Sequence, residues 1–246
     1  MLVFAHRGAS GHKPENTLAA IEQALVMKVD GIEVDVHLCD DELIVIHDRK
    51  VDATTNGKGL LTNFSFAQLR QLDAGQGQQI PTLDEVLRCI NGACSVNIEL
   101  KAEGTVTPLL RCIKKAIDDY GFDLDQLLVS SFNHHLLYQL KSLNNNIHIG
   151  ALTASCPLDY ATFAERLKAF SVHVDIDCIN QAFVDDAHQR GLKVFVYTVN
   201  DEEDIIDMHR LGVDGIFSNY PKRSLVKIAH LNAPNNDQAT PSLITP

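Results

Sequence analysis

Acidic residues within two apolar segments are the first candidates for chemistry. Glu33 and Asp35 lie two positions apart among aliphatic residues, and Glu99 repeats this arrangement in a second apolar segment. Side chains two apart in an extended chain point the same way, so Glu33 and Asp35 share one face. Carboxylates that meet in one pocket need a counter-charge, and their oxygens suit Mg²⁺ or Ca²⁺ better than zinc. The pattern therefore favours a site for a hard divalent cation. The alternative is that these acidic residues face solvent on an edge strand.

Histidine and basic side chains follow apolar segments in the same way. His6 and Arg7 directly follow the first apolar run, and His47 follows a later one. Lys101 comes two positions after Glu99. Paired histidines can move protons to and from reacting groups, and cations can offset the charge of an anion. If these segments are neighbouring strands, the three carboxylates, two histidines and two cations meet at one edge.

Other polar residues with the same spacing carry weaker signals. His37 shares the face of Asp35 and either lines the pocket or is a hydrogen-bonded neighbour of that carboxylate. Asp175 and Asp177 are also two apart on an expected strand. Because no third carboxylate lies near them in the sequence, solvated strand-end residues are favoured over a second metal site.

Short apolar runs alternate with segments of helical period along the chain, and this alternation predicts the fold. One helix is expected at Leu18, Ile21 and Leu25, with Asn16 as its N-cap. Apolar strands separated by helices indicate a parallel sheet that is covered on both faces. About eight such units in 246 residues favour an α/β fold of the (β/α)8 TIM-barrel type over an open doubly wound sheet. The expected strands are 2–5, 31–36, 43–46, 95–100, 127–130, 147–152, 172–176, 193–198 and 215–218.

One stretch interrupts this rhythm. Residues 48–81 are rich in Thr, Asn, Gly and Gln, with a weak helical turn at 66–72. We interpret them as an insertion in an early βα loop, because about 30 residues rarely bury their own core. The prediction is one barrel domain over residues 1–231, followed by a flexible tail over 232–246 that contains three prolines.

Composition excludes several classes of protein. The chain carries 21 Lys and Arg against 32 Asp and Glu, a net charge of −11, which disfavours binding to nucleic acid or to anionic membranes. No run of about 18 apolar residues is present, so we expect no stable membrane insertion. The six cysteines form no metal-binding or disulfide pattern, which favours a reducing compartment. We therefore expect a soluble, cytoplasmic protein with a small-molecule substrate; the sequence gives no indication of its oligomeric state.

The ordered motifs resemble those of one enzyme family, the glycerophosphodiester phosphodiesterases. The resemblance extends from about Phe4 to Pro221, which is nearly the whole chain. The motifs that carry it are His6-Arg7-Gly8, Pro14-Glu15-Asn16-Thr17, Glu33-x-Asp35, His47-Asp48, Asn97-Ile98-Glu99-Leu100-Lys101, Ser130-Ser131-Phe132, Val196-Tyr197-Thr198-Val199-Asn200 and Asp214-Gly215-Ile216-Phe217-Ser218.

The resemblance implies a fold, an activity and a set of site residues. The family is a (β/α)8 barrel that hydrolyses glycerophosphodiesters to sn-glycerol 3-phosphate and an alcohol, with one divalent cation. Its roles, carried over by position, imply metal ligands at Glu33, Asp35 and Glu99, an acid–base pair at His6 and His47, phosphate-contacting cations at Arg7 and Lys101, and a substrate contact at Tyr197.

Two departures from the family pattern stand out. Tyr197 occupies a position where the family often has Trp, and this chain contains no Trp. The segment 53–57 lacks an arginine that often follows the second histidine in the family.

Two other functions are weighed against this one. A related barrel phospholipase, such as a lysophospholipase D or a phosphoinositide phospholipase C-like enzyme, would be favoured by an apolar groove or a membrane-facing helix, and the acidic sequence indicates neither. A non-catalytic binding barrel would be favoured by the loss of a motif histidine or carboxylate. All five of these residues are present.

Overall fold

Eight parallel strands close into a barrel, as the sequence predicted. In the computed structural model, which describes residues 1–233, β1 pairs with β2 on one side and with β9 on the other, so the ring is complete. Most of the predicted tail, residues 234–246, lies outside the described residues. The barrel strands, in order of pairing, are β1 (Leu2–Ala5), β2 (Gly31–Cys39), β4 (Ser95–Leu100), β5 (Leu127–Ser131), β6 (His148–Thr153), β7 (Ser171–Asp175), β8 (Lys193–Tyr197) and β9 (Gly215–Ser218).

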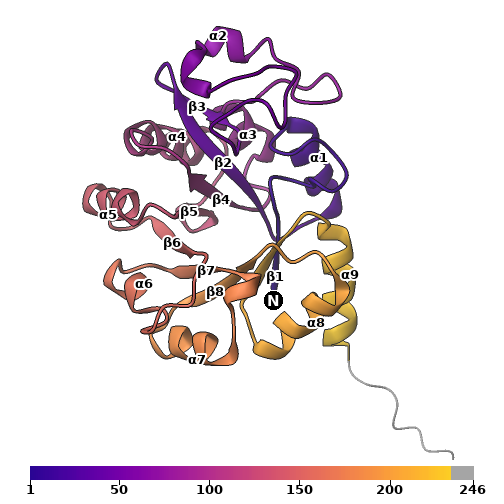
Figure 1. Cartoon of the computed structure of the whole chain (residues 1–246), viewed down its shortest axis with the longest axis vertical. Coiled ribbons are helices and arrows are strands. Elements are labelled where there is room, and N and C mark those ends of the chain that lie inside the picture. Colours follow the sequence, from indigo (N-terminus) through magenta and orange to yellow (C-terminus); the bar gives the residue numbers. More distant parts are fainter. Residues whose placement is uncertain (234–246) are drawn as a thin grey trace, which may run out of the picture.

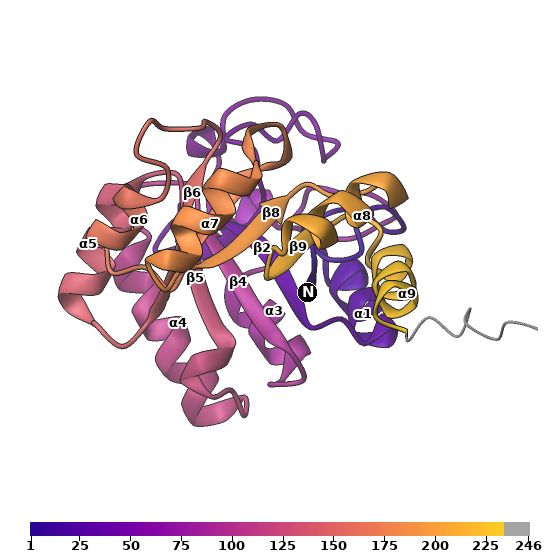
Figure 2. The same ribbon diagram turned by 90° about the horizontal axis from the view of Figure 1, so that it is seen from below.

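Helices between the strands surround the barrel (Figures 1 and 2). Their apolar faces and the outward-facing aliphatic side chains of the strands form the main hydrophobic core. Burying one such side chain contributes about 1.5–3 kcal/mol. The helices are α1 (Leu18–Met27), α3 (Leu83–Ile90), α4 (Val106–Asp119), α5 (His134–Leu143), α6 (Thr162–Arg166), α7 (Gln181–Gln189), α8 (Glu202–Leu211) and α9 (Pro221–Asn232).

The N-terminus of α1 differs from the prediction in a way that matters for the site. Thr17, not Asn16, is the N-cap, and its side chain accepts a hydrogen bond from the backbone N–H of Ala20. Asn16 instead adopts a left-handed backbone conformation with φ of 57° and is buried. Its side-chain amide is therefore directed into the protein, where it contacts Asp35.

The expected third strand is present but does not belong to the barrel. β3 (Glu42–Val45) pairs antiparallel with the far end of β2. Asp40 and Asp41 connect the two strands, and both have positive φ, as a two-residue hairpin turn requires. An apolar run does not reveal strand direction, so the sequence alone could not distinguish this hairpin from a barrel strand. The hairpin returns the chain to the barrel, which places His47 beside the carboxyl end of β2.

The insertion predicted over residues 48–81 contains little regular structure. Its short elements are the 3₁₀ helix η1 (Leu61–Asn63) and the helix α2 (Phe66–Leu69). Val51, Leu61, Leu69 and Ile80 of this segment belong to a separate apolar cluster, which also contains residues of β2 and β3. The hairpin supplies the other wall of this cluster. Figure 1 shows the segment at the end of the molecule away from α7.

Two further short 3₁₀ helices lie in the connections of the barrel. They are η2 (Leu124–Gln126), directly before β5, and η3 (Ile176–Cys178), directly after β7. The second of these places residues at the carboxyl end of the barrel, where active sites lie in this fold.

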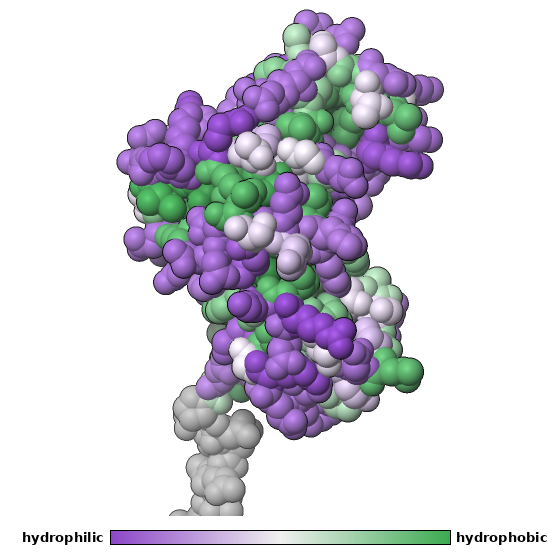
Figure 3. Space-filling view, turned by 90° about the vertical axis from the view of Figure 1, so that its left-hand side faces the viewer, coloured by the Kyte–Doolittle hydropathy of each residue, from purple (hydrophilic) through white to green (hydrophobic). Residues whose placement is uncertain are grey.

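The barrel interior is apolar at one end and polar at the other. Phe4, Leu128, Phe195 and Phe217 form a buried cluster toward the amino ends of the strands. Charged side chains lie at the carboxyl ends. The face shown in Figure 3 is mostly hydrophilic, with hydrophobic areas between the hydrophilic groups. Within residues 1–233, none of the helices combines the length and apolar character that crossing a membrane requires.

Candidate active site

Three carboxylates meet inside the barrel mouth. Glu33, Asp35 and Glu99 each offer an oxygen atom within 4.8 Å of the others. Asp35 and Glu99 are register partners on neighbouring strands β2 and β4. Glu33 is 3% exposed and Asp35 1% exposed, which excludes the solvent-facing alternative. Burial, Asp35 and Glu99 raise the pKa of Glu33 well above its usual range, and burial and Asp35 also raise the pKa of Glu99.

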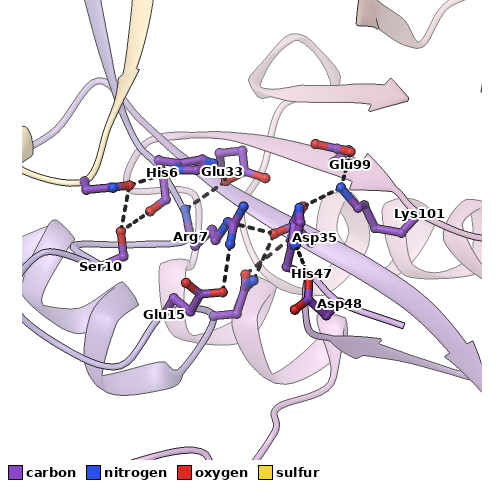
Figure 4. Close-up of polar contacts among 12 residues, drawn as sticks. His6, Arg7, Ser10, Glu15, Glu33, Asp35, His47, Asp48, Glu99 and Lys101 are labelled. Carbon is purple, nitrogen blue, oxygen red and sulfur yellow. Dashed lines mark hydrogen bonds and ion pairs between the residues drawn. The ribbon is translucent and has the colours of Figure 1, made fainter. Parts of the chain in front are cut away.

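Two cations neutralise part of this charge. Arg7 Nε lies 3.4 Å from Asp35 Oδ2, and Lys101 Nζ lies 3.5 Å from Asp35 Oδ1 and 2.6 Å from Glu99 Oε1 (Figure 4). Burial alone would raise the pKa of Asp35, but Lys101 and Arg7 outweigh it and lower that pKa. Asp35 is therefore the carboxylate that the protein itself holds ionised. Arg7 also donates its backbone N–H to Glu33 Oε2 at 2.8 Å, which ties the end of β1 to β2.

His6 lies at the end of β1 and is held through Nδ1. This nitrogen is 2.7 Å from Asn219 Oδ1, and Ser10 Oγ donates to the same oxygen at 3.0 Å. Because an amide oxygen only accepts, His6 Nδ1 carries a hydrogen, and in the neutral ring Nε2 has a free lone pair. Nε2 lies 4.0 Å from Glu33 Oε2. Burial and the nearby Arg7 lower the pKa of His6 to about 4.

His47 follows the hairpin and has a charged partner. Its Nδ1 is 2.7 Å from Asp48 Oδ1. Its carbonyl oxygen accepts a hydrogen bond from His37 Nε2 at 3.0 Å, so His37 is satisfied by the backbone of His47 and not by Asp35. Both expected histidines therefore reach the barrel mouth, each oriented through Nδ1 by a different kind of group.

Tyr197 lies across the mouth from the carboxylates, on β8. Its hydroxyl donates to the carbonyl of Thr153 at 2.8 Å, and it shares a small cavity with Glu99. The ring of Phe132 packs edge-on against it, with centroids 6.0 Å apart, and Lys101 Nζ lies 6.0 Å from the Phe132 centroid. An aromatic wall thus borders the cationic part of the site.

Several residues that hold the site were not assigned roles from the sequence. Asn16 Nδ2 donates to Asp35 Oδ2 at 2.9 Å, and Glu15 Oε1 accepts from Arg7 Nη1 at 2.8 Å. Both lie in the motif 14–17, so their presence was noted but not their contacts. Asp48 lies three positions after the end of β3, and Asn219 directly follows β9. The rule that barrel sites lie at carboxyl strand ends could have indicated Asn219.

The second acidic pair does not form a metal-binding cluster. Asp175 Oδ1 accepts a hydrogen bond from the backbone N–H of Asp177 and caps η3. Among the described residues, Glu33, Asp35 and Glu99 are the only such group. This agrees with the interpretation of Asp175 and Asp177 as strand-end residues.

Fold and site together define a class, a (β/α)8-barrel enzyme with a buried acidic cluster flanked by histidines and cations. The sequence profile of the glycerophosphoryl diester phosphodiesterase family matches residues 6–223. A glycerophosphodiester phosphodiesterase from Caldanaerobacter subterraneus subsp. tengcongensis is 38% identical over 231 residues, covering 90% of this chain and 95% of that protein. One from Bacillus altitudinis is 36% identical over 236 residues, covering 91% and 96%.

A solved structure gives the same result. An Oleispira antarctica phosphodiesterase in complex with the product sn-glycerol-3-phosphate superposes with a TM-score of 0.85 at 32% identity, covering 93% of this chain and 97% of that one. The chain therefore belongs to the glycerophosphoryl diester phosphodiesterase family. The resemblance noted in the sequence, the barrel fold and the assignment as an enzyme that hydrolyses glycerophosphodiesters are confirmed.

Proposed function

We propose that Glu33, Asp35 and Glu99 hold one divalent cation, Mg²⁺ or Ca²⁺, at the barrel mouth. The observation that carries this proposal is the meeting of three buried carboxylates within 4.8 Å. Their oxygen atoms are the donors that both cations prefer. Burial and the neighbouring carboxylates raise the pKa values of Glu33 and Glu99, and a further positive charge would favour their ionised forms.

Arg7 and Lys101 bind the phosphate beside this cation. Glu15 and Asp35 engage Arg7 through Nη1 and Nε, which leaves Nη2 to a phosphate oxygen. Lys101 is held by Glu99 and Asp35 on the opposite side of the cluster. When bound, the metal stabilises negative charge that develops on the phosphate. The two side chains then fix the position of the diester and add to this stabilisation.

His6 and His47 move the protons, and their partners suggest different roles. Asp48 offers His47 a carboxylate oxygen, whereas Asn219 offers His6 only a neutral amide oxygen. We assign His47 as the acid that protonates the departing alcohol and His6 as the base that activates the attacking hydroxyl. An alkyl alcohol leaves poorly as a free alkoxide, so both steps are needed.

The aromatic wall contacts an organic part of the substrate. Tyr197 and Phe132 present ring surface next to Lys101, while the insertion over residues 48–81 contains no long apolar run. A small glycerophosphodiester fits this site better than a two-chain lipid.

The described cysteines form no disulfide, which supports the proposed cytoplasmic location.

The test is a set of glycerophosphodiesters assayed by coupled detection of glycerol 3-phosphate, with and without chelator. We expect release of glycerol 3-phosphate that chelation abolishes and that Mg²⁺ or Ca²⁺ restores. Full activity in excess chelator, with the metal content confirmed as nil, would contradict the metal proposal. Turnover of intact phosphatidylcholine comparable to that of glycerophosphocholine would favour the phospholipase alternative.

A further inference from the structure

A second polar group lies deeper in the barrel, below the carboxylate cluster. The cavity of about 30 Å³ that Tyr197 shares with Glu99 is also lined by Glu33 on β2, Asn97 on β4 and His173 on β7. His173 is completely buried, and its ring packs against Phe195 and Phe217 at centroid distances of 5.4 and 5.1 Å. Neither Asn97 nor His173 was assigned a role from the sequence.

Three buried polar atoms of these residues lack a protein partner. They are Glu33 Oε1, Asn97 Oδ1 and His173 Nδ1, none of which has a hydrogen bond within the described residues. The opposite atom of each group is engaged: Glu33 Oε2 by the backbone of Arg7, Asn97 Nδ2 by Ser130 and His173 Nε2 by Ser171. Buried polar groups almost always have a hydrogen-bond partner, so three unpaired atoms on residues that line one cavity require an explanation.

The hydrogen-bonding character of the three atoms is complementary to a water molecule. Burial lowers the pKa of His173 to about 3, so its ring is neutral and only one nitrogen carries a hydrogen. Within the described residues, the Ser171 hydroxyl is bonded only to His173 Nε2, at 2.9 Å. If Ser171 donates, Nδ1 carries the ring hydrogen and acts as a donor, while Glu33 Oε1 and Asn97 Oδ1 are acceptors.

We infer that this cavity binds one ordered water, which accepts from His173 Nδ1 and donates to Glu33 Oε1 and Asn97 Oδ1. A buried water molecule needs a cavity of about 10–15 Å³ and two to four polar partners, and this cavity supplies both. Gly150 on the neighbouring strand β6 leaves room for this histidine. A Cβ atom at Gly150 would lie 2.3 Å from His173 Nε2, so only glycine at this position leaves room for the imidazole ring.

The water makes His173 a positioning residue for the metal site, an extension that rests on the proposed function. Glu33 is fixed by the protein through one oxygen, and the water fixes the other, so the carboxylate plane is set before a cation binds. Hydrogen-bonded partners of metal ligands typically change metal affinity or activity about 10–100-fold when they are removed. His173 therefore acts on Glu33 without touching the substrate.

Two substitutions of His173 separate this role from packing. The side-chain nitrogen of Asn can occupy the place of Nδ1, whereas that of Gln can occupy the place of Nε2. His173→Gln should weaken binding of Tb³⁺ or Ca²⁺ about 10-fold or more, and His173→Asn should retain most of the affinity. Binding is measured by luminescence or calorimetric titration without substrate, so that the readout does not depend on catalysis.

Phe195→Leu is the matched control. It removes packing against the same ring but no polar atom, so it should lower thermal stability while changing metal affinity less than about twofold. Circular dichroism of all three variants verifies that they fold. Metal affinity of His173→Gln equal to wild type, or an equal loss in Phe195→Leu, would overturn the positioning role.

A crystal structure of the wild-type protein tests the water directly. We expect a water oxygen at about 2.7–3.2 Å from Glu33 Oε1, Asn97 Oδ1 and His173 Nδ1. A dry cavity at a resolution that shows ordered water elsewhere in the barrel would overturn the inference. If the wild-type protein binds no metal but the water is present, the metal proposal fails and the buried water stands.

Discussion

Two pairs of acidic residues with the same spacing have different environments at opposite sides of the barrel mouth. Glu33 and Asp35 on β2 are buried beside Glu99 and between two cations. Asp175 at the end of β7 is partly exposed and Asp177 is exposed, and the first caps the turn that contains the second. The register partner of Asp175 on β8 is Tyr197, not a carboxylate. Spacing alone therefore does not form a carboxylate cluster; the residue that the neighbouring strand brings alongside completes it.

The charged groups of the barrel mouth also lie mainly on one side of it. The side formed by β1, β2 and β4 contains the histidine, the cations and the carboxylates of the proposed reaction (Figure 4). The side formed by β6, β7 and β8 contributes Leu152 and Tyr197, with the neutral His173 buried beneath them. A phosphate that binds on the first side leaves an organic end of the diester to face the second. The following substitutions are expected to have large effects on the first side and small effects on the second.

The largest loss is expected at the two histidines. His6→Ala and His47→Ala should each slow the chemical step by about 10²–10⁴-fold, the usual contribution of a positioned proton-transfer group. Substrate binding should change much less, because Arg7 and Lys101 remain. With a p-nitrophenyl ester, whose leaving group departs unprotonated, His47→Ala should recover most of its activity and His6→Ala should not. Equal losses on both substrates would refute the acid–base assignment.

The next largest loss is expected at the carboxylates. Glu33→Gln or Glu99→Gln should lower kcat/KM about 10²–10³-fold at limiting metal, because metal stabilisation of the transition state is worth several kcal/mol. Folding should be retained, since each change relieves repulsion among the buried carboxylates. The matched control is Asp175→Asn, which has the same chemistry on the other side of the mouth. Similar losses in control and test variants would show that the two acidic pairs are not distinct.

A smaller effect concerns stability and pH. Burial lowers the pKa of His173 to about 3, while an unfolded histidine titrates near 6.5. Between these values the unfolded chain binds more protons, so this contribution is lost as the pH falls below 6.5. From pH 7 to pH 5, wild type should lose about 2 kcal/mol more unfolding free energy than His173→Asn. Urea denaturation at both pH values measures this, and parallel losses would contradict it.

The smallest effect is expected at the aromatic wall. Tyr197→Phe removes the hydrogen bond to Thr153 but keeps the ring, so kcat/KM should fall by less than about 10-fold, in line with the net worth of one hydrogen bond of about 0.5–1.5 kcal/mol. The change should appear mainly in KM, because Tyr197 faces the organic part of the substrate. Steady-state kinetics on glycerophosphocholine provide the measurement. A loss as large as that of the histidine variants would place Tyr197 in the proton-transfer step.

The barrel could be predicted because its strands are short apolar runs separated by helical segments. Strands β1, β4 and β9 begin and end at the residues expected. The antiparallel direction of β3 could not be read from its apolar residues, since pairing depends on the turn at Asp40 and Asp41. The apolar cluster of the insertion could not be predicted either. Part of it comes from the hairpin of β2 and β3, and the sequence did not indicate that hairpin.

The site was predictable in its residues but not in its contacts. Motif spacing brought Glu33, Asp35 and Glu99 together, as the structure bears out. The orienting partner Asn219 could not be assigned, because a hydrogen bond between residues 213 positions apart depends on closure of the barrel. Asp48 directly follows His47, but the sequence does not show that its side chain turns back to the imidazole ring. His173 gave no signal, since a histidine in an apolar strand is usually a core residue. The role proposed for His173 rests on the unpaired polar atoms of the residues that line the same cavity.

Metal titration of the two acidic pairs tests the central claim most directly. Wild-type protein freed of metal is titrated with Mg²⁺ or Ca²⁺ by calorimetry, alongside Glu33→Gln and Asp175→Asn. We predict that wild type and Asp175→Asn bind one ion per chain with similar affinity and that Glu33→Gln loses most of this affinity. Undiminished binding in Glu33→Gln, or loss of binding in Asp175→Asn alone, would contradict the placement of the metal at the carboxylates of β2 and β4.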